Sequence, residues 1–183
     1  MNQATTTEVV IPWATYPDMV SSLNKFMPGH GADFLHAVIG IVGETGELAM
    51  AGDRGNIIEE CSDLEFYVEA GWQALERIHG PGIRLPAHSF ASEQGTVLND
   101  LMVNATILLD YAKKQWVYNQ NIPLDTLSAW LAKVEARLLS YYEVIGLTRK
   151  EARDFNMRKL AIRYGSKYSD NAAQARADKA EGS

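Results

Sequence analysis

Two pairs of acidic residues have the types and spacing that metal chemistry requires. Glu44 and Glu47 lie three positions apart, and Glu60 and Asp63 repeat that spacing after a spacer of twelve residues. Residues three apart on a helix share one face, so each pair can direct two carboxylates to the same side. Four converging carboxylates repel one another by on the order of 4 kcal/mol for each 4 Å contact at an effective dielectric of about 20. Either the pairs face solvent, or a multivalent cation holds them together.

The chemistry of that cation follows from the ligands. Ligation by carboxylate oxygens alone suits Mg²⁺ or Mn²⁺ rather than zinc or iron. Glutamates three apart are also common on solvated helix faces, so the spacing leaves both interpretations open.

Helices must position these carboxylates. Apolar residues recur at helical spacing over 33–51 and again over about 57–78, and Gly52 to Asn56 form a turn signal between the two segments. Because so short a turn makes the two helices antiparallel neighbours, we expect both acidic faces to meet at a common spot.

The remaining sequence predicts more helices and no sheet. Three further segments are predicted to be helical: 96–118, from Asp125 or Thr126 to about Gly146, and 148–164. Thr148 followed by Glu151 matches a capping box and opens the last of these helices. Sustained β alternation is lacking, so the predicted fold class is all-α, a bundle of about five helices.

The predicted organisation is one domain over residues 1–170. Its parts are the metal-binding helix pair at 28–79, a second helix pair at 96–146, a basic C-terminal helix at 148–168, and a disordered tail at 171–183. The second pair resembles a degenerate copy of the first, with Asn104 and Ile107 in place of the first acidic pair. Any two amphipathic helix pairs look alike, so the duplication stays a hypothesis.

Three glycines, Gly40, Gly43 and Gly46, interrupt an otherwise strong helix beside the first acidic pair. Each costs about 1 kcal/mol relative to alanine in a helix. Tight packing between helices and access for a ligand both explain glycine at these positions.

Composition excludes several classes of protein. The net charge of −6 and pI near 5.2 argue against a protein whose main partner is nucleic acid. The single Cys61 excludes a disulfide framework and a cysteine-based zinc cluster. No apolar run approaches the roughly 18 residues that span a bilayer, and Met1 to Val10 lack the features of a secretory signal. We therefore expect no membrane partner and a cytoplasmic location.

Two segments resemble a known family. Residues 34–48 (FLHAVIGIVGETGEL) and 59–64 (EECSDL) are similar to the MazG-type nucleotide pyrophosphohydrolases, especially their phage-borne relatives. That family has ExxE, a spacer of 12 to 28 residues and then ExxD, so the spacer here is at the short limit. Residues 156–164 (NMRKLAIRY) resemble the family's NxxKLxxRYP segment, with Gly165 in place of the proline.

The resemblance implies a fold of the all-α nucleoside triphosphate pyrophosphatase type and a hydrolase acting on phosphoric anhydrides. The implied reaction converts a (d)NTP and water into (d)NMP and pyrophosphate, with Mg²⁺ as cofactor and Mn²⁺ as a possible substitute. The resemblance also implies that the metal-binding and catalytic residues are Glu44, Glu47, Glu60 and Asp63. It also implies a homodimer or homotetramer in the cytoplasm of a bacterium or of a phage-infected host.

The resemblance also suggests residues that bind the substrate: His36, Tyr67, Asn156, Lys159 and Arg163. Lys159 and Arg163 lie four apart on one helical face and supply donors for phosphate oxygens, with Asn156 three residues before Lys159. The alternative for this trio is a solvated basic helix end. For His36, contact with the base and plain packing are both open.

Two other functions compete with this interpretation. One is a diphosphatase of the same superfamily that is specific for dUTP or dCTP. The other is a non-enzymatic helical interaction module whose acidic faces are merely solvated.

Overall fold

The computed structural model describes residues 9–25, 27, 31–89 and 94–180. Every regular element among them is a helix, which confirms the predicted all-α class. The helices are α1 (Tyr16–Leu23), α2 (Ala32–Met50), α3 (Arg54–His79), α4 (Gln94–Val117), α5 (Leu124–Ile145), α6 (Arg149–Tyr164), α7 (Asp170–Ala175) and α8 (Ala177–Ala180). None of the helices in this described part of the chain has the length and apolar character needed to cross a bilayer.

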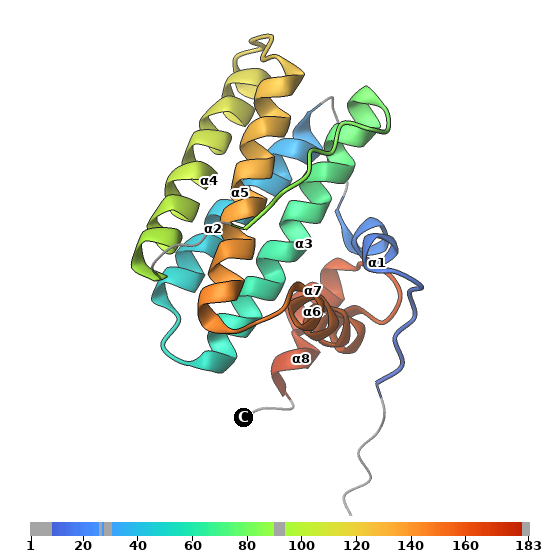
Figure 1. The fold of residues 1–183 in the computed structure, drawn as a ribbon. Coiled ribbons are helices and arrows are strands. Elements are labelled where there is room, and N and C mark those ends of the chain that lie inside the picture. The colour runs from blue at the N-terminus through green and yellow to red at the C-terminus, as the bar shows by residue number, and fades with distance from the viewer. Residues whose placement is uncertain (1–8, 26, 28–30, 90–93, 181–183) are drawn as a thin grey trace, which may run out of the picture.

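Four long helices form a bundle. Figure 1 shows α2, α3, α4 and α5 side by side, and packing runs around the ring from α2 to α3, α5, α4 and back to α2. Their apolar faces share one core, in which Phe34, Trp72, Leu101 and Leu131 are almost fully buried. The bundle therefore holds α2 and α3, the two helices that carry the acidic pairs, as antiparallel neighbours.

A second layer lies against the outside of α3. Helices α1 and α6 pack on α3 and on each other, around a smaller core that includes Trp13, Met19, Leu23 and Leu160. In Figure 1, α6 is viewed almost along its axis, crossing beside the lower part of α3. This layer brings the predicted basic helix to the acidic pairs.

Buried ion pairs attach α6 to the bundle. The carboxylate of Glu65, fully buried on α3, accepts hydrogen bonds from Arg149 Nε at 3.0 Å and Arg153 Nε at 2.9 Å. Glu135 on α5 is paired with Arg149 and accepts a bond from Trp72 Nε1 at 2.8 Å. Arg149 and Arg153, near the start of α6, therefore pair with buried carboxylates. These pairings differ from the alternative in which the basic residues of this helix are solvated.

The capping residues account for where the helices begin. The predicted capping box of α6 is confirmed, since Thr148 accepts from the Glu151 backbone N–H and Glu151 accepts from that of Thr148. Helix α3 begins at Arg54, three residues before the predicted start, because the Asp53 side chain caps it through Asn56 N at 3.0 Å. Helix α5 begins at Leu124 after Pro123, so the prediction that Asp125 or Thr126 caps it is wrong.

Helix α1 is missing from the sequence-based prediction. Pro17 lies in the first turn of this helix, where its missing N–H needs no partner. Thr15 and Asp18 form a reciprocal capping box that fixes this start.

The C-terminal segment also differs from the prediction of a disordered tail. Residues 170–180 form α7 and α8 and pack against α6, while residues 181–183 lie outside the described part. We call residues 170–180 the C-terminal strap. Ion pairs with α3 and α6, described below, hold it in place.

Candidate active site

Three of the predicted metal ligands lie together. One carboxylate oxygen from each of Glu44, Glu47 and Glu60 lies within 4.8 Å of the other two. Glu44 and Glu47 occupy one face of α2, and Glu60 comes from the adjoining face of α3. The expectation that the two acidic faces meet is therefore confirmed for these three residues, which we call the acidic triad.

The electrostatics of the triad show that these carboxylates are crowded. Burial raises the pKa of Glu44 to about 8, helped by the charge of Asp63 and by a hydrogen bond with Glu60. Burial also raises the pKa of Glu60, while its hydrogen bond with Glu44 acts in the opposite direction. Protons or a cation must neutralise part of this charge at neutral pH.

The fourth predicted ligand, Asp63, has protein partners instead. Both of its carboxylate oxygens lie 2.5 Å from Lys159 Nζ, and Asn156 Nδ2 donates to one of them at 2.8 Å. Asp63 still lines the same cavity as the acidic triad. The predicted set of four carboxylates is thus divided into a close triad and one ion-paired neighbour.

The amide of Asn156 is fully used within the protein. Asn156 is completely buried, and its Oδ1 accepts from the Tyr16 hydroxyl at 3.0 Å while its Nδ2 donates to Asp63. Asn156 therefore positions Asp63 rather than presenting its amide to a ligand. Lys159 is also buried, pairing with Asp63 and lying 3.6 Å from Glu59.

Arg163 is held by the C-terminal strap. Its Nε and one terminal nitrogen donate to the two oxygens of Asp178, each at 2.6 Å. Lys179 donates to Glu59 at 2.5 Å and fixes the strap to α3 as well. The parallel pair of bonds to Asp178 has the geometry in which a guanidinium also binds phosphate. No sequence motif marks the strap. Its contacts with the site are visible only in the folded chain.

Two adjoining cavities meet at these residues. The acidic cavity, of about 400 Å³, is lined by the acidic triad together with Asp63, Arg163, Arg176 and Lys179. The ring cavity, of about 240 Å³, is lined among others by Asn24, Lys25, His36, Phe66, Tyr67 and Tyr168. Glu44, Asp63 and Arg163 line both cavities, so the two cavities adjoin at these three residues.

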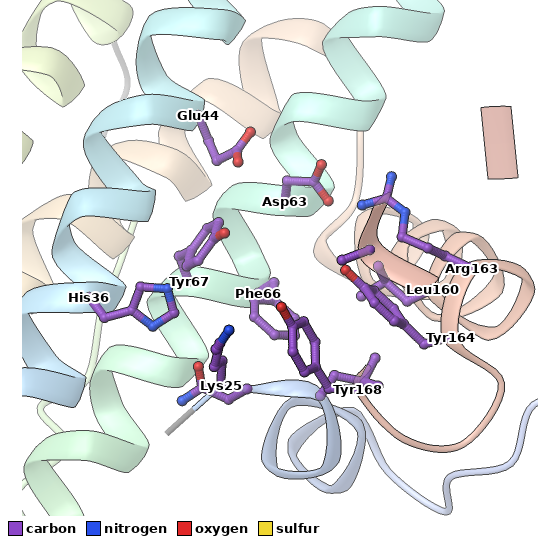
Figure 2. A pocket seen from close by; sticks show the side chains of 13 residues that line it. Lys25, His36, Glu44, Asp63, Phe66, Tyr67, Leu160, Arg163, Tyr164 and Tyr168 are labelled. Atoms are coloured by element: carbon purple, nitrogen blue, oxygen red, sulfur yellow. The ribbon is translucent and has the colours of Figure 1, made fainter. Parts of the chain in front are cut away.

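Figure 2 shows how the ring cavity is arranged. Glu44 and Asp63 lie at one end, His36 and Lys25 lie at the other, and Tyr67 stands between them. The rings of His36 and Tyr67 meet edge to face, with centroids 6.3 Å apart. Burial raises the pKa of Tyr67 to about 12, with the charges of Glu44 and Asp63 adding to the effect, so the phenol stays protonated.

One of the three glycines on α2 is explained by this cavity. A Cβ atom on Gly40 would come within 2.4 Å of the Tyr67 ring, so glycine here lets the ring lie against α2. Added Cβ atoms on Gly43 and Gly46 meet nothing within 4 Å among the described residues. Close packing therefore accounts for Gly40 alone.

Gly165 explains a departure from the family pattern. It ends α6 with a φ of +64°, which proline cannot adopt because its ring fixes φ near −65°. The backbone at this position therefore excludes proline, and the strap begins at Asp170, five positions after Gly165.

The donor set of the acidic triad suits a divalent cation. Carboxylate oxygens are hard ligands of the kind that Mg²⁺ and Mn²⁺ prefer. Burial is the main cause of the raised pKa of Glu44, and a cation in contact with this carboxylate would favour its ionised form. Glu44, Glu47 and Glu60 are therefore the residues that fit a metal ion here.

The chain was compared with protein-family models, curated proteins and solved structures. None of these three comparisons produced a match. The likeness to MazG-type enzymes therefore rests on the motifs quoted above alone.

Proposed function

We propose that this chain is a Mg²⁺-dependent nucleoside triphosphate pyrophosphohydrolase that converts a (d)NTP and water into (d)NMP and pyrophosphate. The observation that supports it most is the convergence of Glu44, Glu47 and Glu60 in a cavity that is also lined by Arg163 of α6 and by Arg176 and Lys179 of the C-terminal strap. Metal-binding carboxylates and phosphate-binding cations are both needed for phosphoryl chemistry, and here they line one cavity.

The residues of the site have different roles in the proposed reaction. Glu44, Glu47 and Glu60 would hold the cation, which when bound neutralises phosphate charge and lowers the pKa of a coordinated water. Arg163 offers two parallel N–H donors to phosphate oxygens once Asp178 yields them. Asn156 and Lys159 hold the Asp63 carboxylate in a fixed position beside the triad.

The proposed reaction makes and breaks one bond at phosphorus. Water attacks the α-phosphorus, its oxygen forms the new P–O bond, and the bond to the bridging oxygen of pyrophosphate breaks. A carboxylate of the cluster that does not ligate the cation is the group available to accept the proton from water. Two products leave, a mononucleotide and pyrophosphate.

Carboxylate substitution tests this proposal. We expect Glu47→Gln to reduce pyrophosphate release at least a hundredfold, because the amide removes a charged ligand while keeping the side-chain shape. Pyrophosphate release is measured with eight NTPs and dNTPs in Mg²⁺ or Mn²⁺, and the far-UV circular dichroism should stay unchanged. Glu143→Gln is the matched control, since Glu143 is an exposed glutamate on α5.

The panel also separates the competing functions. Turnover confined to dUTP or dCTP would identify the pyrimidine-specific diphosphatase. Full activity in Glu47→Gln would contradict the assignment of the triad as the metal site. Absence of turnover with every nucleotide, together with no thermal stabilisation by Mg²⁺ and nucleotide, would favour the helical interaction module.

A further inference from the structure

The ring cavity contains two polar atoms that lack hydrogen-bond partners. Asn24 is 6% exposed, and its Nδ2 has no partner among the described residues. The Nδ1 atom of His36 is likewise buried and unpartnered within the described chain. Both residues line the ring cavity.

Unpartnered buried donors are costly, and native chains rarely keep them without a reason. Asn24 follows α1 directly and belongs to neither family-like motif. A leucine would fill a similar volume there without leaving a polar group unsatisfied. The retained amide therefore indicates a partner supplied from outside the chain.

The surroundings define what that partner is. Phe66, Tyr67, Tyr164 and Tyr168 line the same cavity, and aromatic walls favour a flat ring. The polar atoms of Asn24 and His36 require hydrogen-bonding groups on the edge of that ring. Carbonyl oxygens and ring nitrogens on the edge of a purine or pyrimidine meet both requirements.

The relation between the cavities sets the direction of the ligand. The end of the ring cavity at Glu44, Asp63 and Arg163 is shared with the acidic cavity, where the proposed function places the phosphates. His36 lies away from that end in Figure 2, beyond Tyr67. A nucleotide with its phosphates at the triad would carry its base toward His36 and Asn24.

We propose that Asn24 and His36 bind the polar edge of the nucleotide base in the ring cavity, with Asn24 as a specificity-determining residue. This inference rests on the proposed function for the position of the phosphates. The Asn24 amide donates to a carbonyl or ring nitrogen of the base. His36 Nδ1 donates or accepts according to which of its ring nitrogens is protonated.

Binding of mononucleotides tests the inference without any turnover. Isothermal titration calorimetry with UMP, CMP, GMP and AMP in Mg²⁺ measures affinity, and ribose 5-phosphate is the probe that lacks a base. We expect at least one mononucleotide to bind more tightly than ribose 5-phosphate. Asn24→Leu should lower the affinity for that mononucleotide about three- to tenfold, which is the contribution of one hydrogen bond. The affinity for ribose 5-phosphate should stay unchanged.

Stability gives an independent reading. Because Asn24 Nδ2 has no hydrogen-bond partner among the described residues, Asn24→Leu should keep or raise the Tm while it weakens base binding. His36→Leu is the second variant and should lower the affinity for the same mononucleotide. Asn104→Leu is the matched control, because Asn104 lines a separate cavity beside α5 and should change no affinity.

Three results would overturn the inference. These are a lowered Tm in Asn24→Leu, mononucleotide affinity unchanged in that variant, and wild-type affinities no better than that for ribose 5-phosphate. Failure of the proposed reaction is distinguishable from these results. Asn24-dependent binding without triphosphate turnover would reject the reaction and keep the base site, whereas turnover without such binding would reject the base site alone.

Discussion

At the scale of single residues, the carboxyl group of Glu44 is the part of the site whose ionisation costs the folded chain most clearly. Its pKa is raised to about 8 by burial and by neighbouring carboxylates, from an ordinary value of 4.5. Such a shift disfavours the folded state whenever the carboxylate is ionised. A cation bound among these carboxylates would remove that penalty. The raised pKa of Glu44 therefore links the stability of the chain to metal binding.

We expect the Tm of the metal-free chain to fall as pH rises from about 4.5 to about 8. In that window the unfolded chain has released the Glu44 proton and the folded chain still holds it, so raising pH favours unfolding. Thermal unfolding in chelator measures this effect, with Glu44→Gln as the control that lacks the titrating group. An equally steep fall in Glu44→Gln would show that Glu44 is not its source.

At the scale of elements, the contact between α2 and α3 depends on a glycine. Gly40→Ala places a Cβ within 2.4 Å of the Tyr67 ring, so we expect a lower Tm and a disturbed ring cavity. Gly43→Ala is the control on the same helix, and it should stabilise by up to about 1 kcal/mol because its Cβ enters open space. Thermal unfolding measures both, and equal Tm changes in the two variants would contradict the packing account.

The C-terminal strap makes a second prediction at this scale. Asp178 occupies the Arg163 donors that the proposed substrate needs, so Asp178→Asn should lower the KM for triphosphate about three- to tenfold with kcat unchanged. Steady-state kinetics measure this change. Asp154→Asn is the matched control, because Asp154 pairs with Lys150 on α6 and lines neither cavity. A raised KM in Asp178→Asn would instead show that the strap assists substrate binding.

Elements with strong periodic patterns were predictable from the sequence, and those fixed by distant contacts were not. Helices α2, α3 and α6 follow from apolar spacing and, for α6, from the capping box of Thr148 and Glu151. The strap is polar and short, and it is held by ion pairs from Asp178 and Lys179 to residues far along the chain. No local pattern encodes such pairs.

The site shows the same division. Helical spacing, together with the short turn between α2 and α3, was enough to predict that Glu44, Glu47 and Glu60 meet. The pairing of Asp63 with Lys159 depends on where α6 crosses α3, which the buried ion pairs of Glu65 decide. Asn24 lies outside every motif, and only its burial beside the ring cavity reveals it.

At the scale of the whole molecule, the net charge of −6 conceals an ordered separation of charge. Buried carboxylates such as Glu65 and Glu69 bind arginines and hold the helices together. The acidic triad remains without such a pairing partner among the described residues and adjoins Arg163 at one cavity. Under the proposed function, the phosphate ligand would reach this cavity together with a divalent cation, despite the acidic surface.

The measurement that tests the central claim most directly is ³¹P NMR of a nucleoside triphosphate incubated with the chain and Mg²⁺. The account predicts that the three triphosphate signals are replaced by those of a nucleoside monophosphate and pyrophosphate, and that chelation of the metal stops the change. Products identified as a nucleoside diphosphate and orthophosphate, or turnover unaffected by chelator, would contradict it.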